Sequence, residues 1–150
     1  MQTNCAVLDS VFKSDIPLTH ALDIRVQQWQ NQQLQLKIPL APNTNHKQTM
    51  FGGSVYCALT LAGWGWLYLR LKEALITEGE IVIHGGNVEY PAPVNSDAIV
   101  TCNPPDEAQW KKFVTLFQRR GRARLTLISE IHTATGELAA RLEGQYVLYK

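Results

Sequence analysis

The chain has 150 residues, of which 45% are apolar and 18% are charged, and its formal net charge is +1. This length favours one domain with a core of its own, and the composition excludes a disordered chain. A net charge so close to zero provides no general attraction to nucleic acid or to an anionic membrane, so any basic site has to be local.

The three cysteines, Cys5, Cys57 and Cys102, lie far apart and contain no C-x-x-C pair. Neither a disulfide framework nor a zinc site is indicated, and we expect no metal centre. Free cysteines are usually small buried residues, and we expect that of all three. The N-terminal residues show no basic segment followed by an apolar one, so we expect no signal peptide and a cytoplasmic protein.

The first third of the chain predicts a helix and a hairpin. Apolar side chains recur at helical spacing over residues 5–14, and Pro17 follows as a helix stop. Apolar and polar residues then alternate over 22–27 and again over 34–40, as in half-buried strands. The polar residues 30–32 between them indicate the turn of a hairpin.

The most informative stretch is the polar loop and uncharged run over residues 43–75. The loop ends in Gly52-Gly53, and no charged side chain occurs between Phe51 and Leu69. We predict a long helix from Gly52 to Leu75. A run of this length is also compatible with a membrane span, but its glycines and the strand patterns on both sides favour a buried central helix and no membrane span.

Two glycines within this helix, Gly63 and Gly65, each cost about 1 kcal/mol relative to alanine in a helix interior. Such a cost is tolerable where another part of the fold has to approach the helix closely. We therefore expect a sheet that curls around the helix at this point.

After the central helix, four more strands are predicted, over residues 81–90, 98–102, 123–133 and 142–148. A short helix before the third of these strands carries Trp110, Phe113 and Phe117 on one face and ends at Gly121. One antiparallel sheet of five to six strands wrapped on one long helix buries all of these apolar faces. The predicted fold is thus α+β with the hotdog architecture.

The chain resembles the hotdog-fold thioesterases, and within them the thioesterase domain at the C-terminus of YiiD-type acetyltransferases. The likeness covers nearly the whole chain, and we expect a single hotdog domain over residues 1–150, with no acetyltransferase domain beside it. It rests on Pro42-Asn43, Asn45, Thr49, Phe51-Gly52-Gly53-Ser54, Leu61-Ala62-Gly63-Trp64-Gly65, Tyr90, Pro93-Val94 and Gly121-Arg122-Ala123-Arg124.

The resemblance implies an acyl-CoA or acyl-carrier thioester as substrate, with no cofactor apart from the CoA moiety, and a homodimer or dimer of dimers with the site between subunits. In the family, a loop asparagine and a His-Gly-Gly motif position the thioester carbonyl, and a helix carboxylate acts as nucleophile or base. Asn45 and Gly52-Gly53 match the carbonyl-holding part. Phe51 replaces the histidine and Thr60 replaces the carboxylate.

The chemistry of these residue types agrees in part with hydrolysis. A helix N-terminus presents unpaired N–H groups to a developing oxyanion, and Gly52 and Gly53 let a ligand approach the backbone. Asn45 can hold a carbonyl or a water, or it can cap its own loop. Thr60 can orient water but cannot act alone as a base, and its hydroxyl can instead bond to its own helix.

A base has to come from elsewhere, and His46 is the one histidine of four that stands beside the loop. The alternative for His46 is an ordinary exposed loop side chain. His84-Gly85-Gly86 reads like the family motif, but it falls in a strand region, where its glycines indicate a bulge or a close backbone approach.

Four basic residues, Arg119, Arg120, Arg122 and Arg124, occur within six positions. The arginine fork matches phosphate geometry, so these residues are candidates for binding the CoA phosphates. The alternative is a solvated, charged sheet edge. No stacking motif or wider basic field accompanies them, so nucleic-acid binding is not expected.

Three functions are compatible with the predicted fold and the candidate site residues. The first is thioester hydrolysis at the N-terminus of the central helix. The second is a non-hydrolytic acyl-CoA or acyl-lipid binding module, suggested by the missing carboxylate at Thr60. The third is dehydratase chemistry, which the uncharged helix disfavours.

Overall fold

The computed structural model describes residues 2–150. The helices of this range are α1 (Asn4–Asp15), α2 (Leu18–Leu22), α3 (Gly52–Glu73) and α4 (Glu107–Arg120), with one 3-10 turn, η1 (Ala41–Asn43). The strands are β1 (Arg25–Gln30), β2 (Gln33–Ile38), β3 (Glu80–Glu89), β4 (Ala98–Cys102), β5 (Arg122–His132) and β6 (Leu138–Tyr149).

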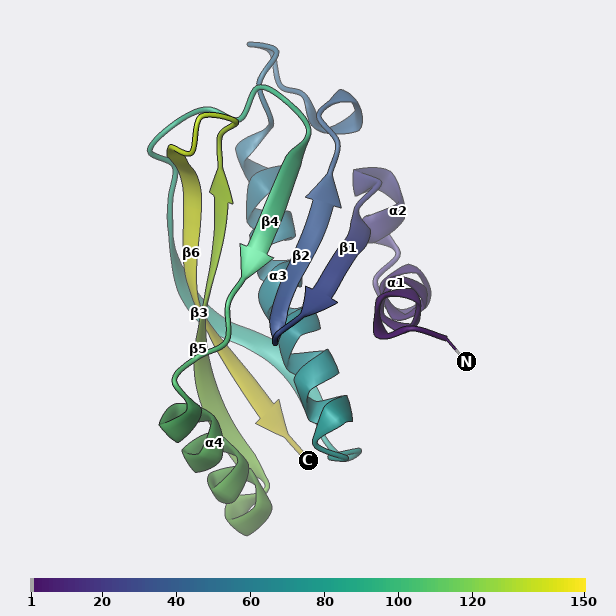
Figure 1. Cartoon of the computed structure of the whole chain (residues 1–150), viewed down its shortest axis with the longest axis vertical. Coiled ribbons are helices and arrows are strands. Elements are labelled where there is room, and N and C mark those ends of the chain that lie inside the picture. The colour runs from purple at the N-terminus through teal and green to yellow at the C-terminus, as the bar shows by residue number, and fades with distance from the viewer. Residues whose placement is uncertain (1) are drawn as a thin grey trace.

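The six strands form one antiparallel sheet in the order β1-β2-β4-β5-β6-β3. The sheet curves around the long helix α3, and α4 lies at the end of the molecule where α3 ends (Figure 1). This is the hotdog fold, so the predicted fold class, the hairpin and the long central helix are confirmed. No helix among residues 2–150 combines the length and the hydropathy needed to cross a membrane.

The two interior glycines of α3 are where the fold approaches the helix most closely. A Cβ on Gly63 would lie 2.1 Å from the Tyr146 hydroxyl of β6, and one on Gly65 would lie 2.9 Å from Leu8 of α1 and 3.0 Å from Leu34 of β2. Real Cβ atoms do not come so near to other atoms. The expected close approach is confirmed, and it is made by side chains of the sheet and of α1.

The two edge strands of the sheet, β1 and β3, have different neighbours. Helix α1 lies against edge strand β1, where the Val26 amide donates to Asp9 Oδ1 at 2.8 Å. At the other edge, β3 pairs only with β6 among the described residues. A shift of register between Ile83 and Gly85 confirms the bulge that the His84 segment predicted.

Three local expectations were wrong. Leu22 ends helix α2 instead of starting a strand, because Asp23 turns the chain with a φ of 52°. Helix α3 ends at Glu73, since Leu75 has a φ of 60°. Cys102 is buried as expected, whereas Cys5 and Cys57 are only half-buried.

Candidate functional site

The loop before α3 is held by the side chain of Asn45. Its Oδ1 accepts from the amides of Lys47, at 2.9 Å, and of Thr49, at 3.1 Å, and its Nδ2 donates to Thr49 Oγ1 at 2.9 Å. The backbone adds a bond from Asn45 N to Thr49 O at 2.8 Å. Both ends of the Asn45 amide are therefore engaged within its own loop, and the side chain determines the shape of residues 45–49.

A second asparagine, Asn43, anchors the same loop to the core. It is buried, and its Nδ2 donates to Leu22 O at 2.9 Å and to Pro39 O at 2.8 Å. Its carbonyl accepts from the Phe51 amide at 2.7 Å, next to the first residue of α3. In the sequence, Asn43 stands out only as part of the family likeness, since burial in a loop has no periodic signal.

The N-terminus of α3 carries no side-chain cap. The first amides of a helix have no partner within it, so those of Gly52 and Gly53 remain available to a ligand. The Phe51 side chain is 56% exposed and lies against Gly53, while the Tyr90 hydroxyl donates to Gly52 O at 3.0 Å. Together with the positive end of the helix dipole, these amides form a suitable place for negative charge on an oxygen.

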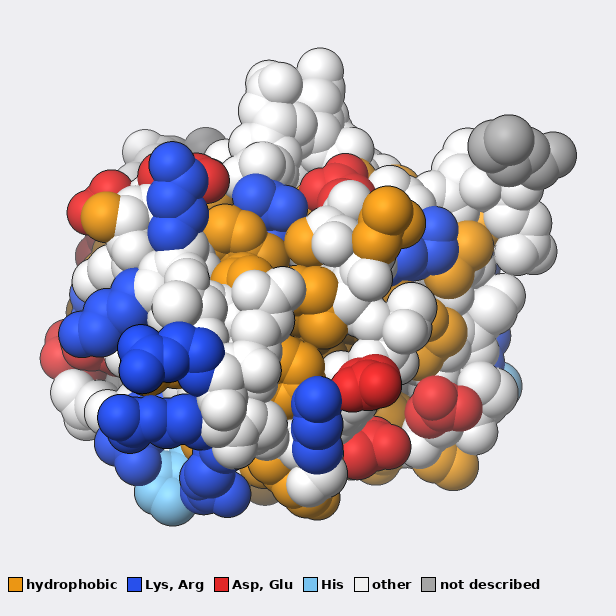
Figure 2. Space-filling model, turned by 90° about the horizontal axis from the view of Figure 1, so that it is seen from below, with side chains coloured by type: hydrophobic (Ala, Val, Ile, Leu, Met, Phe, Trp, Pro, Cys, Tyr) orange, Lys and Arg blue, Asp and Glu red, His pale blue; other side chains and the backbone are white. Residues whose placement is uncertain are grey.

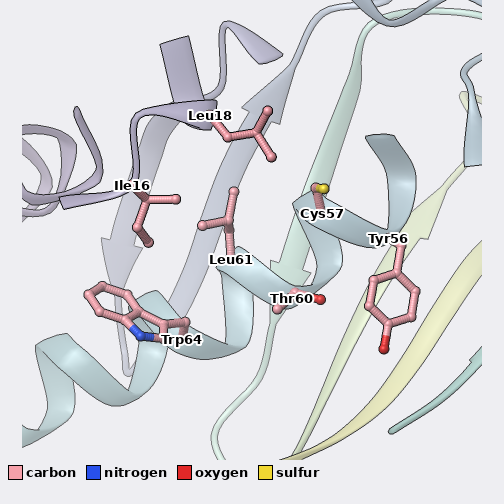
Figure 3. A pocket seen from close by; sticks show the side chains of 7 residues that line it. All are labelled: Ile16, Leu18, Tyr56, Cys57, Thr60, Leu61 and Trp64. Atoms are coloured by element: carbon pink, nitrogen blue, oxygen red, sulfur yellow. The ribbon is translucent and has the colours of Figure 1, made fainter. Parts of the chain in front are cut away.

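An apolar groove of about 330 Å³ runs along the exposed side of α3 and is lined by Ile16, Leu18, Tyr56, Cys57, Thr60, Leu61 and Trp64. Figure 3 shows Ile16, which follows α1, and Leu18, which begins α2, facing the side chains of α3. Gly53 and Thr60 are seven residues apart, which is about two turns or 10 Å along the same side of a helix. The groove thus begins near the available amides and continues along α3.

Thr60 provides the polar atom of interest in this groove. Its Oγ1 is the one buried side-chain nitrogen or oxygen without a hydrogen-bond partner among residues 2–150. The alternative in which this hydroxyl bonds to its own helix is therefore wrong. An unpaired buried hydroxyl costs about 1–3 kcal/mol, so such an atom calls for a partner that the free protein does not supply.

Two tyrosines outside the groove, Tyr90 and Tyr146, bond to the backbone of the same part of α3. The Tyr146 hydroxyl donates to the Thr60 carbonyl at 2.9 Å, and burial raises its pKa far above the ordinary value, with Cys102 and Tyr56 adding to the effect. Burial also raises the pKa of Tyr90, again with a contribution from Tyr56. These hydroxyls stay protonated near neutral pH and act as hydrogen-bond donors, not as bases.

The candidate base His46 is exposed on the loop. It lines a cavity of about 370 Å³ that also includes Asn45, Thr49 and Tyr90. Because Tyr90 contacts Gly52, this cavity adjoins the N-terminus of α3. The structure therefore brings Asn45, His46 and the glycine pair to one end of the molecule.

The four arginines are not at that end. Arg119 and Arg120 close α4, and Arg122 starts β5, which pairs there with the last residues of β6. In Figure 1, α4 and the end of α3 lie opposite the loop before α3. Helix α3 has 22 residues and is about 33 Å long, so within one protomer the arginines lie far from Gly52.

The arrangement can hold an acyl thioester in one orientation. The amides of Gly52 and Gly53 suit its carbonyl oxygen, and the apolar groove suits its acyl chain. The part of the chain that the structure describes contains no group of three His, Cys, Asp or Glu side chains that could hold a metal ion. Tyr90 and Tyr146 were missed as site residues, because their contacts with α3 depend on sheet pairing over long sequence distances.

The chain is similar to known proteins along nearly its whole length. The family model described as "Putative thioesterase (yiiD_Cterm)" matches residues 5–150. A protein of unknown function from Chlorobaculum tepidum is 32% identical, with a TM-score of 0.92 over 97% of this chain and 94% of that one.

A crystal structure named as a putative thioesterase, from Shewanella oneidensis, is 31% identical, with a TM-score of 0.88 over 100% of both chains. A protein from Pseudomonas aeruginosa, named as a probable thioesterase, is 19% identical with a TM-score of 0.82 and covers 99% of this chain and 97% of that one. At that identity it supports the fold alone.

Proposed function

Since the chain belongs to the yiiD C-terminal family of hotdog thioesterases, we propose that it hydrolyses an acyl thioester of CoA or of an acyl carrier. The acyl chain lies in the groove along α3, and the thioester carbonyl faces the amides of Gly52 and Gly53. CoA, where present, is part of the substrate, and no further cofactor takes part.

The observation that carries this proposal is the unpaired hydroxyl of Thr60. Thr60 is one of the residues that line the apolar groove, about two turns of α3 beyond Gly53, and its hydroxyl oxygen is itself buried. A water or a substrate oxygen that binds there relieves an unmet hydrogen bond. We assign Thr60 the role of orienting the attacking water.

In the proposed reaction, water attacks the thioester carbonyl and a C–O bond forms as negative charge gathers on the carbonyl oxygen. The α3 amides stabilise that charge. His46 takes the proton from the water, the C–S bond breaks, and the proton passes to the thiolate. The products are a carboxylic acid and a thiol. Asn45 shapes the loop that presents His46, and its amide is the further candidate for contacting the carbonyl.

We further propose a homodimer that forms along β3. Its outer edge is unpaired among the described residues, and unpaired edges favour strand addition. Two β3 strands related by a two-fold axis run antiparallel, so the arginine end of one subunit adjoins the loop end of the other. The dimer would thus bring together two ends of the fold that are far apart within one protomer. Sedimentation equilibrium tests the dimeric state by measuring the mass of the particle in solution.

The activity itself is tested with a thiol-detecting assay over acyl-CoA and acyl-carrier substrates of graded chain length. We expect release of thiol for at least one chain length and a loss of about tenfold in kcat/KM for Thr60→Val, which corresponds to one hydrogen bond. A folded protein that releases no thiol across both panels would contradict hydrolysis.

A non-hydrolytic acyl-thioester binding module is the second candidate, because α3 carries no charged side chain between Gly52 and Leu69. Calorimetry that detects binding of an acyl thioester without turnover would favour it. In that case Thr60→Asp is the informative variant, since a gain of hydrolysis would identify the missing carboxylate as the cause. The unpaired cysteines support the cytoplasmic location predicted for either candidate.

A further inference from the structure

The basic surface formed by Arg119, Arg120, Arg122 and Arg124 concentrates the positive charge of this protein. The rest of the chain carries ten basic and thirteen acidic side chains, so outside this surface the protein is slightly acidic. Figure 2, which views the molecule from the α4 end, shows Lys and Arg side chains gathered on one side of that end. The distribution is uneven enough to orient a charged partner.

All four arginines are exposed. The ion pairs within residues 2–150 involve Arg25, Arg141 and Lys150, and none of the four. Glu78 is held at 2.8 Å by the side chain of Lys150, whose backbone amide donates to Gly121 O. The guanidinium groups of this surface thus remain free to meet carboxylates or phosphates from outside.

Apolar side chains accompany the arginines on the same side of the sheet. On β6, Tyr149 lies directly opposite Arg122 and is 36% exposed. Val147 lies opposite Arg124 on one side and opposite Val82 of β3 on the other, and Val82 is 40% exposed. Side chains directly opposite each other on neighbouring strands share a face. Arginine, tyrosine and apolar side chains together are typical of a protein interface.

The shape of this surface also favours a large partner. Ala123 is buried, so Arg122 and Arg124 project from the side of β5 that faces away from the core. That is the outer side of the curved sheet (Figure 1). None of the four arginines lines the groove at Thr60 or the cavity at His46. An outward-curving surface encloses little of a small nucleotide, whereas an acidic protein can contact several arginines at once.

We propose that this basic surface docks an acidic carrier protein, which brings the acyl chain as a thioester on a flexible arm. The inference rests on the proposed function and specifies its substrate class as carrier-bound thioesters. In the proposed antiparallel dimer, the basic surface of one subunit adjoins the loop end of the other. A carrier docked on one subunit then presents its thioester to the site of its partner.

The test measures kcat/KM of the wild type and of the double variant Arg122→Gln/Arg124→Gln. Each protein is assayed with the same acyl chain carried by CoA and by an acidic acyl carrier protein. We expect the double variant to lose about tenfold in kcat/KM on the carrier-protein substrate, as steering charges are removed. The acyl-CoA value should change less than twofold. Added salt should lower the wild-type rate on the carrier protein and affect the variant much less.

The matched control is Lys13→Gln/Lys37→Gln, which removes the same net charge from exposed positions on the β1–β2 side of the fold. If the control variant lost as much kcat/KM on the carrier-protein substrate as the arginine variant, the proposal would be overturned. An equal loss of the arginine variant on both substrates would also overturn it, and would assign the arginines to the CoA phosphates. Unchanged rates on both substrates would overturn it too. Should wild type hydrolyse neither substrate, fluorescence anisotropy with labelled carrier protein still tests docking, and equal affinities for wild type and the Arg variant would refute it.

Discussion

In the C-terminal half of α3 the indole N–H groups of both tryptophans find partners within the fold. Trp66 Nε1 donates to Gln32 O at 2.6 Å, Trp64 Nε1 donates to Ile81 O at 3.2 Å, and Glu73 accepts from Trp29 Nε1 at 2.9 Å. The N-terminal half begins without a side-chain cap and contains the unpaired hydroxyl of Thr60.

This contrast separates two tasks along one helix. The paired half holds the sheet, α1 and α4 together, while the other half keeps hydrogen-bonding groups available for something that the free chain lacks. If that is correct, substitutions in the paired half should act mainly on stability. Substitutions in the open half should act mainly on binding and catalysis.

The largest effect is expected for Trp66→Ala. Trp66 is fully buried and contacts Trp29 and Trp110 edge to face. Its truncation should lower the free energy of unfolding by about 3–5 kcal/mol in urea titrations. If the variant does not fold, Trp66→Phe keeps a ring and should cost less. A loss below about 1 kcal/mol for Trp66→Ala would contradict the assignment of stability to this half.

Asn45→Ala comes next, because it removes two acceptor bonds and one donor bond from the loop. We expect a loss of about 2 kcal/mol in stability, from about 1 kcal/mol for each bond to a backbone amide. Asn45→Asp keeps the acceptor oxygen and should recover most of it. Activity that falls in both variants, including the stable one, would indicate a direct contact of the Asn45 amide with substrate.

Much of the fold follows from patterns within short stretches of sequence. Alternation identified the β1–β2 hairpin, and the spacing of Trp110, Phe113 and Phe117 identified α4. Helix α2 was missed, because its five residues are too few to show a helical period. Local patterns predict elements well when the elements are long enough to repeat.

The candidate site was harder to predict, because its arrangement depends on contacts between distant residues. The sequence indicated Asn45 and the glycine pair, but it left open whether the Asn45 amide holds a ligand or its own loop, and the structure shows the loop contacts. Neither the unpaired state of Thr60 Oγ1 nor the distance of the arginines from Gly52 follows from spacing. Both depend on the order in which the six strands are paired.

Thr60→Val tests the open half with a change that leaves the side-chain shape almost intact. Removing an unpaired buried hydroxyl should raise the free energy of unfolding by about 1 kcal/mol, because its desolvation is no longer uncompensated. The same change should lower kcat/KM by about tenfold. Thr60→Ser, which keeps the hydroxyl, is the matched control. If Thr60→Val were less stable than the wild type and fully active, the assignment of Thr60 to binding and catalysis would be wrong.

The smallest effect concerns Tyr146, which links the two halves, since its hydroxyl bonds to the Thr60 carbonyl and packs on Gly63. Burial raises the pKa of this phenol in the folded protein, so folding favours its neutral form. The stabilisation is complete below the unfolded pKa of about 10 and is lost as pH rises above it.

Tyr146→Phe should cost about 1 kcal/mol at pH 8 through the lost hydrogen bond, and less at pH 10.5. Urea titrations at the two pH values measure the difference. Equal costs at both values would mean that Tyr146 ionises as readily in the fold as in the unfolded chain, and its hydroxyl would then be accessible to water at the centre of α3.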